Sequence, residues 1–161
     1  MKFVHLIEIN DPLNPLIEPL SRAQLWRGLL MRAEDPKPFV LGLDECQVTM
    51  RDETGMSREL TFGELTVRDR VTYDIGKSVR YDTAAQDDMP AAWLVMTIEE
   101  PEPGALFVRF EYDSGTSPDT SDGLNQLYDD LRRQAYEEAD IDTIRKIREM
   151  AALGHLGGAP N

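Results

Sequence analysis

The sequence predicts an α+β fold in which a curved antiparallel sheet of about seven strands wraps around a long C-terminal helix. Three observations lead to this class: a first strand is followed by a short amphipathic helix, six segments of alternating polarity come next, and the chain ends in a long stretch with helical spacing. Short turns make consecutive strands antiparallel neighbours, so the last helix is left to cover the concave face. We expect the space between this helix and the sheet to form a cavity for a small molecule.

Residues 3–9 predict the first strand, because they are rich in β-branched and aromatic side chains. Three prolines then interrupt regular structure, and Ser21, with a glutamine three residues later, has the capping-box pattern of a helix start. The helix ends before Pro36, since the residue preceding a proline avoids the α region. Gly28 within it indicates the close approach of a neighbouring element. The apolar face of this helix consists of Leu25, Trp26, Leu29, Leu30 and Ala33.

Six segments with a period of two follow, and they predict the remaining strands. They are centred on residues 45–51, 60–62, 65–73, 79–81, 93–98 and 106–112. Asp52–Gly55 and Pro101–Gly104 have the turn chemistry of hairpin connections. Two polar stretches, residues 83–90 and 114–122, are expected to be loops.

The C-terminal stretch has two apolar faces that are rotated by roughly a third of a circle from each other. The first comprises Leu124, Leu127 and Leu131, and the second comprises Tyr136, Ala139, Thr143, Ile147 and Met150. Either one helix buries different faces along its length, or the helix breaks near residues 140–142. We expect one helix of about twenty residues or more.

The length of 161 residues fits one domain, and we place it at residues 1–153. Glycines and a proline dominate residues 154–161, so this segment is predicted to be a flexible tail with no core to join.

The net charge of −13 argues against nucleic acid and anionic membranes as partners, since the sequence shows no basic stripe. The N-terminus lacks the apolar region of a signal peptide, and no apolar run approaches the ~18 residues of a membrane span. We therefore expect a cytoplasmic, acidic protein that is a monomer or a homodimer and is not integral to a membrane.

The inventory of reactive side chains predicts neither a metal site nor a cofactor. Cys46 is the single cysteine, and His5 and His155 are far apart in the sequence. No glycine-rich phosphate loop is present, and acidic pairs lack the spacing of a calcium loop.

The chain resembles the helix-grip fold of the START-related (SRPBCC) superfamily, which includes the birch pollen allergen, and within it the AtaL-like subfamily of bacteria and fungi. The motifs that carry the resemblance are Phe3-x-His5-Leu6, Gln24-Leu25-Trp26-x-Gly28-Leu29, Met96–Gly104 with Leu106–Phe110, and Gln134–Tyr136 with Thr143–Ile147. The resemblance covers nearly the whole chain and implies a hydrophobic cavity between the sheet and the last helix. It supplies no catalytic residues, so these stay unknown.

The candidate cavity residues are the apolar and aromatic side chains on one face of the strands and of the last helix. They are Val48, Phe62, Tyr73, Tyr81, Leu94, Met96, Phe110, Tyr112 and Tyr136. A tyrosine in a cavity offers one directional hydrogen bond on an apolar body, which suits the orientation of a ligand. The alternative is that each tyrosine packs with its hydroxyl at the rim.

Asp69 interrupts an apolar strand face, and the period of two directs it inward. A buried carboxylate without a partner has a raised pKa and is suited to proton transfer. Two alternatives remain: a strand-end position near solvent, or neutralisation by Arg109. The alternation of its own strand places Arg109 on the outer face.

Two main functions are compatible with this layout. The first is the binding or transport of a small, largely apolar ligand. The second is an enzyme of cyclase, dehydratase or lyase type for a polyketide-like or aromatic substrate, with Asp69, Tyr81 and Tyr112 as polar groups. A third is a protein-interaction module that uses the acidic surface. Convergent polar groups in the cavity favour the enzyme, and their absence favours the carrier, because the fold alone does not decide.

Overall fold

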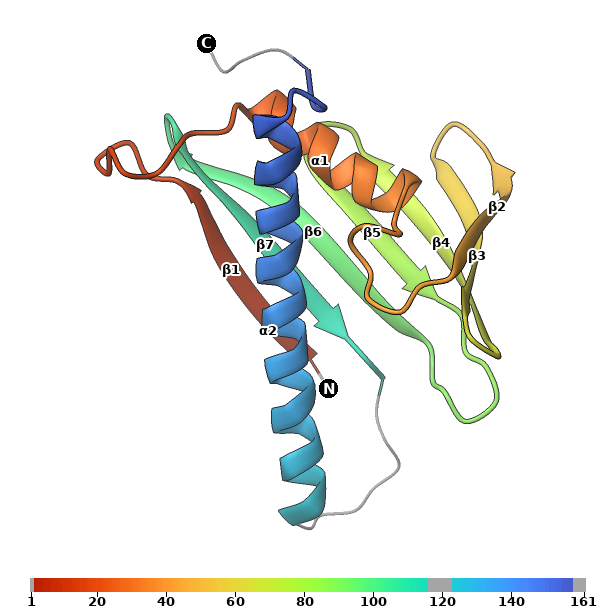
Figure 1. The fold of residues 1–161 in the computed structure, drawn as a ribbon. Helices are drawn as coiled ribbons and strands as arrows, with labels where there is room; N and C mark the ends of the chain where they lie inside the picture. Colours follow the sequence, from red (N-terminus) through yellow and green to blue (C-terminus); the bar gives the residue numbers. More distant parts are fainter. Residues whose placement is uncertain (1, 116–122, 158–161) are drawn as a thin grey trace.

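Seven antiparallel strands form one sheet in the computed structural model, which describes residues 2–115 and 123–157 (Figure 1). The sheet order is β1-β7-β6-β5-β4-β3-β2, so β1 and β2 lie at the edges. The strands are β1 (Lys2–Asn10), β2 (Glu45–Arg51), β3 (Gly55–Phe62), β4 (Leu65–Asp74), β5 (Ser78–Thr83), β6 (Ala92–Glu102) and β7 (Ala105–Asp113). The strand count and the antiparallel order confirm the predicted helix-grip fold.

Helix α1 (Arg22–Glu34) begins with the predicted capping box. The Gln24 backbone N–H donates to Ser21 Oγ at 3.0 Å, and the Ser21 N–H donates to Gln24 Oε1 at 3.0 Å. Leu25, Leu29 and Ala33 of the predicted apolar face are fully buried, and Trp26 packs half-buried against the core. The helix ends at Glu34, and its C-cap, Asp35, directly precedes the proline.

Helix α2 (Gly123–Ala152) is continuous through residue 140, which confirms the single-helix alternative. Among residues 126–152 of this helix, the buried side chains belong to the C-terminal half and include Thr143, Ile144 and Ile147. Leu127 and Leu131 are each 53% exposed, so the expectation that both apolar faces are buried is wrong. The cause is geometric: the N-terminal turns of α2 extend past the end of β1, where the sheet offers no surface to cover them (Figure 1).

The two helices touch where α1 carries Gly28. A Cβ at this position would lie 2.5 Å from Ile147 Cγ2 of α2, which confirms the predicted close approach. The short segment after α2 is also tied to the fold. Leu156 is buried in the core, and its carbonyl accepts a hydrogen bond from Arg27. The expectation of a tail with no core to join therefore does not hold at Leu156, while residues 158–161 lie outside the described residues, as does most of the predicted loop 114–122.

Candidate functional site

The strand register places the candidate residues in rows that face the helices. Tyr81 on β5 pairs with Leu94 on β6, Leu94 pairs with Tyr112 on β7, and Tyr112 pairs with Phe3 on β1. The neighbouring row runs Val79, Met96, Phe110 and His5 in the same way. Because directly paired residues share one face of a sheet, the two rows form a continuous apolar and aromatic surface beneath α1 and α2.

The structure brings together most of the predicted cavity residues. Tyr81, Met96 and Phe110 are buried, while Leu94 and Tyr112 pack partly buried against the core. Tyr136 of α2 stacks on Tyr112, with ring centroids 4.1 Å apart and an interplanar angle of 8°.

The three remaining candidates lie away from this group. Val48 belongs to edge strand β2 and is 41% exposed, so it lines no enclosed interior. Phe62 is half-buried at the end of β3. The Tyr73 hydroxyl donates to Glu34 at 3.2 Å on the exposed side of α1, as the rim alternative predicts.

A polar cluster lies between α2 and the sheet, centred on Asp140. The Asp140 side chain is only 2% exposed. It accepts a hydrogen bond from the Tyr112 hydroxyl, and its second oxygen lies 3.2 Å from Nδ1 of His5. Three elements, β1, β7 and α2, thus contribute to one buried carboxyl site.

Burial dominates the electrostatics of this cluster. It raises the pKa of Asp140 to about 6, although the hydrogen bonds from Tyr112 and His5 and the charge of Arg32 act in the opposite direction. Burial and the neighbouring carboxylate also raise the pKa of Tyr112, so its phenol stays a hydrogen-bond donor. Asp140 therefore changes its charge near neutral pH, as groups that transfer protons do.

A small hollow gives access to the aromatic side of this cluster. Its volume is about 170 Å³. It is lined by Thr83, Ala92, Trp93, Leu94, Tyr112, Asp113, Ser114 and Tyr136. Three of the predicted cavity residues, Leu94, Tyr112 and Tyr136, thus border one opening.

A second group of polar side chains surrounds Tyr81. Arg58 of β3 donates to both oxygens of Asp69, at 2.9 and 2.6 Å, and also to the Ala33 carbonyl at 2.9 Å. The guanidinium groups of Arg32 and Arg58 lie 4.9 and 5.2 Å from the centroid of the Tyr81 ring. The Tyr81 hydroxyl and the Arg32 Nε are buried and have no hydrogen-bond partner among residues 2–115 and 123–157.

These contacts decide the alternatives for Asp69. The inward direction is confirmed, because the side chains of Arg58 and Asp69 are only 4% and 7% exposed. The strand-end position near solvent is wrong, and so is neutralisation by Arg109, since Arg58 is the partner. Arg109 pairs with Glu99 instead, as its predicted outer-face position allows. Asp69 thus serves as the ion-pair partner of a buried arginine.

Sequence patterns alone missed Asp140, Arg32 and Arg58. Asp140 carried a usable signal, because it lies four residues after Tyr136 and three before Thr143, on the apolar face of the last helix. A carboxylate that interrupts an apolar face is predicted to point inward, and this holds for Asp140 as it does for Asp69. Arg32 gave no such signal, since arginines on amphipathic helices usually extend to solvent.

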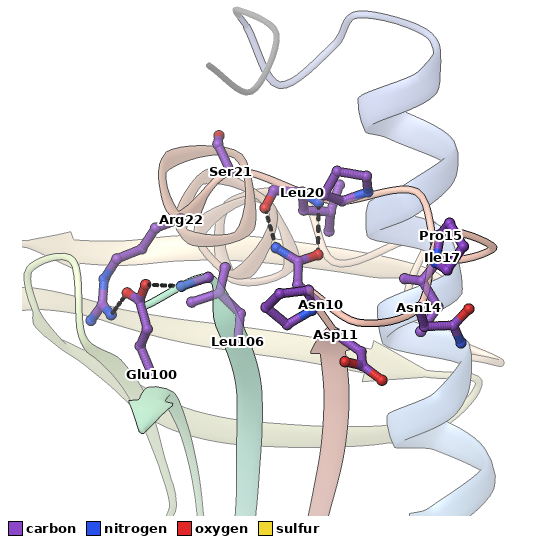
Figure 2. Close-up of a pocket in the computed structure, with 13 residues that line it drawn as sticks. Asn10, Asp11, Asn14, Pro15, Ile17, Leu20, Ser21, Arg22, Glu100 and Leu106 are labelled. Atoms are coloured by element: carbon purple, nitrogen blue, oxygen red, sulfur yellow. Dashed lines mark hydrogen bonds and ion pairs between the residues drawn. The ribbon is translucent and has the colours of Figure 1, made fainter. Parts of the chain in front are cut away.

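A larger hollow lies at the other end of β1, under the loop that leads to α1 (Figure 2). Its volume is about 640 Å³, but its polar side chains already have partners. Asn10 exchanges two hydrogen bonds with the Leu20 backbone, at 2.6 and 2.9 Å, and Glu100 binds both Arg22 and the Gly104 N–H. The polar side chains of this hollow are thus engaged with the protein itself, unlike the Tyr81 hydroxyl and the Arg32 Nε.

The described residues contain no group of three side chains able to hold a metal ion. In the same part of the chain, no helix is both long and apolar enough to cross a membrane.

Comparisons with known proteins agree with this architecture. The family model described as acetylaranotin biosynthesis cluster protein L (AtaL) matches residues 7–154. A search of curated proteins finds no match.

Solved structures share the fold at low sequence identity. Ara h 8.0201 has a TM-score of 0.58 at 11% identity, with 92% of this chain and 98% of that chain covered. The di-domain ARO/CYC StfQ from the steffimycin biosynthetic pathway has a TM-score of 0.66 at 10% identity, with 94% of this chain and 52% of that chain covered. The Aha1 dimer from Colwellia psychrerythraea has a TM-score of 0.56 at 15% identity, with 88% and 91% covered.

Proposed function

Since this chain belongs to the AtaL family and has the helix-grip fold, we propose that it binds a small, largely apolar molecule between the sheet and α2. The observation that carries the proposal is the hollow bordered by Leu94, Tyr112 and Tyr136, which opens beside a continuous apolar and aromatic face. Apolar walls with a few oriented polar groups are the usual composition of small-molecule sites.

The hollow is smaller than most ligand sites, so it forms only the outer part of the proposed one. In this proposal the Tyr136 ring turns away from Tyr112, and an apolar group of the ligand takes its place in the stack. Phe3 offers a further aromatic contact to such a group, because its ring centroid lies 5.9 Å from each of the two tyrosines.

A ligand screen with a matched variant tests the proposal. Fatty acids, aromatic polyketides and flavonoids are added to the protein, and the melting temperature is measured with the fluorescence of Trp93, which lines the hollow. A bound ligand stabilises the native state by about 2.7 kcal/mol at a hundredfold excess over its Kd.

We expect at least one upward shift, which Tyr136→Ala reduces and Tyr128→Ala, at an exposed position of the same helix, leaves unchanged. A screen without any shift argues against the proposal.

A second candidate is the enzyme of cyclase, dehydratase or lyase type for a polyketide-like or aromatic substrate. Convergent polar groups favour it, and Asp140 with Tyr112 and His5 is such a group. In this function Asp140 accepts a proton from a carbon of the substrate and returns it to another atom. A ligand identified by the screen is incubated with protein in deuterium oxide and analysed by mass spectrometry. Deuterium gain or product formation that Asp140→Asn abolishes supports the enzyme, and an unchanged ligand supports the carrier.

A further inference from the structure

We propose that Arg32 and Tyr81 form a subsite for the carboxylate of an apolar carboxylic acid. This inference rests on the proposed ligand binding and names the chemical class of the ligand. It comes from two donors inside the fold that the protein leaves without acceptors.

The Tyr81 hydroxyl is the first of these donors. Tyr81 is 5% exposed, and its oxygen is buried without a hydrogen-bond partner in the part of the chain that the structure describes. Buried polar groups nearly always have partners, because leaving one unpaired costs the full desolvation free energy. An unpaired phenol in the middle of a sheet therefore indicates that an acceptor belongs beside it.

The Arg32 Nε is the second donor, and Arg58 provides an internal comparison. Both guanidinium groups lie within about 5 Å of the Tyr81 ring centroid. Arg58 is neutralised by Asp69 and donates to a carbonyl as well. Arg32 is half-buried and forms no ion pair with any described residue, so its positive charge lies next to Tyr81 without a directly bound anion.

The nearby acid does not fill this role. Asp140 feels the charge of Arg32, but its oxygens are engaged by Tyr112 and His5. A cation without a directly bound anion favours an anionic acceptor over a neutral one, and the planar guanidinium fork matches a carboxylate. The row that runs from Tyr81 through Leu94 to Tyr112 supplies an apolar surface for the rest of the ligand.

Three probes with the same ten-carbon chain distinguish the contribution of the headgroup to the affinity from that of the apolar chain. They are decanoic acid, methyl decanoate and 1-decanol. Their affinities are measured at pH 7.5 by calorimetry, for the wild type and for Tyr81→Phe and Arg32→Met. Tyr128→Phe and Arg133→Met, at exposed positions of α2, serve as controls.

We expect the wild type to bind decanoic acid at least tenfold more tightly than either neutral probe. Arg32→Met abolishes this preference, Tyr81→Phe reduces it several-fold, and the controls keep it. Tyr81→Phe removes one oxygen and preserves the packing, so it supplies the test if Arg32→Met does not fold.

The outcomes separate this inference from the proposed function. Equal affinity for all three probes overturns the carboxylate subsite and leaves ligand binding intact. Equal affinity for the acid and the ester, with both above the alcohol, also overturns it, because the acceptor is then a neutral carbonyl. If no probe binds and the wider screen finds no ligand, the proposed function fails, and the subsite fails with it.

Discussion

Replacing Asp140 with asparagine isolates the energetic effect of the buried carboxylate. Asparagine has nearly the same shape and keeps an oxygen that accepts the Tyr112 hydrogen bond. It cannot ionise, so it removes the charge that burial disfavours. The charged and titratable groups facing this position are His5 on β1, Tyr112 on β7 and Arg32 on α1, and all three stay in place.

The magnitude follows from the raised pKa of Asp140, about 6 against an ordinary value of 3.8. A shift of about two pKa units corresponds to about 3 kcal/mol. Between these two values the folded protein holds a proton at Asp140 that the unfolded chain has released, so the free energy of unfolding falls as the pH rises. The change is complete once the pH exceeds the folded pKa. The asparagine variant lacks this loss, so its stability relative to the wild type rises by about 2 to 3 kcal/mol from pH 4 to pH 7.5.

Urea unfolding followed by tryptophan fluorescence measures this difference at a series of pH values. All other carboxylates are common to both proteins and cancel in the comparison. Asp142→Asn is the control, since Asp142 lies on the same helix, is exposed and pairs only with Arg145. The assignment of a buried, destabilised carboxylate is refuted if the free energy of unfolding of Asp140→Asn relative to the wild type does not change with pH, or if it declines as the pH rises.

Four further substitutions test the packing and the hydrogen bonds of the same region by urea unfolding. Gly28→Ala places a methyl group against Ile147 and destabilises the protein by about 1–3 kcal/mol, despite the better helix propensity of alanine. In a double-mutant cycle with Ile147→Ala, we expect a favourable coupling energy between the two substitutions. If their effects on the free energy of unfolding are additive, the contact is contradicted. Tyr81→Phe leaves the stability unchanged or raises it by about 1 kcal/mol, because its hydroxyl has no partner, and a clear loss contradicts that geometry. Tyr112→Phe costs about 1.5–3 kcal/mol at neutral pH, since Asp140 loses a donor. Asp69→Asn costs about 3–5 kcal/mol by leaving the Arg58 cation buried without its anion, and a loss below 1 kcal/mol excludes a desolvated pair.

The fold was predictable because its signals are local. The capping box at Ser21, the period of two in the strands and the short hairpin turns each act within a few residues, and together they allow one sheet order. The overhang of α2 was not predictable in this way. Leu127 and Leu131 have the spacing of a buried face, but their burial depends on how far the sheet extends, which no local pattern encodes.

The candidate site was predictable only in its apolar part. The alternation of strands β5 to β7 identifies Tyr81, Leu94 and Tyr112, because the period of two fixes the face of each side chain. The polar contacts join residues that are distant in sequence: His5 and Asp140 are separated by 135 positions. Such pairs depend on where helix and sheet cross, and a single sequence carries no direct record of that crossing.

The charges on the inner face point to the same conclusion as the apolar surface. Two acids, Asp69 and Asp140, and two arginines, Arg32 and Arg58, lie beneath or between the helices. One acid and one arginine form a closed, desolvated ion pair. The remaining acid is bound by a phenol and an imidazole, and the remaining arginine forms no ion pair with any described residue. The charge of Arg32 acts on Asp140, but the two residues form no ion pair. In the proposed subsite, Arg32 and Tyr81 donate to the carboxylate of the ligand, and Asp140 lies at the Tyr112 end of the same row of side chains.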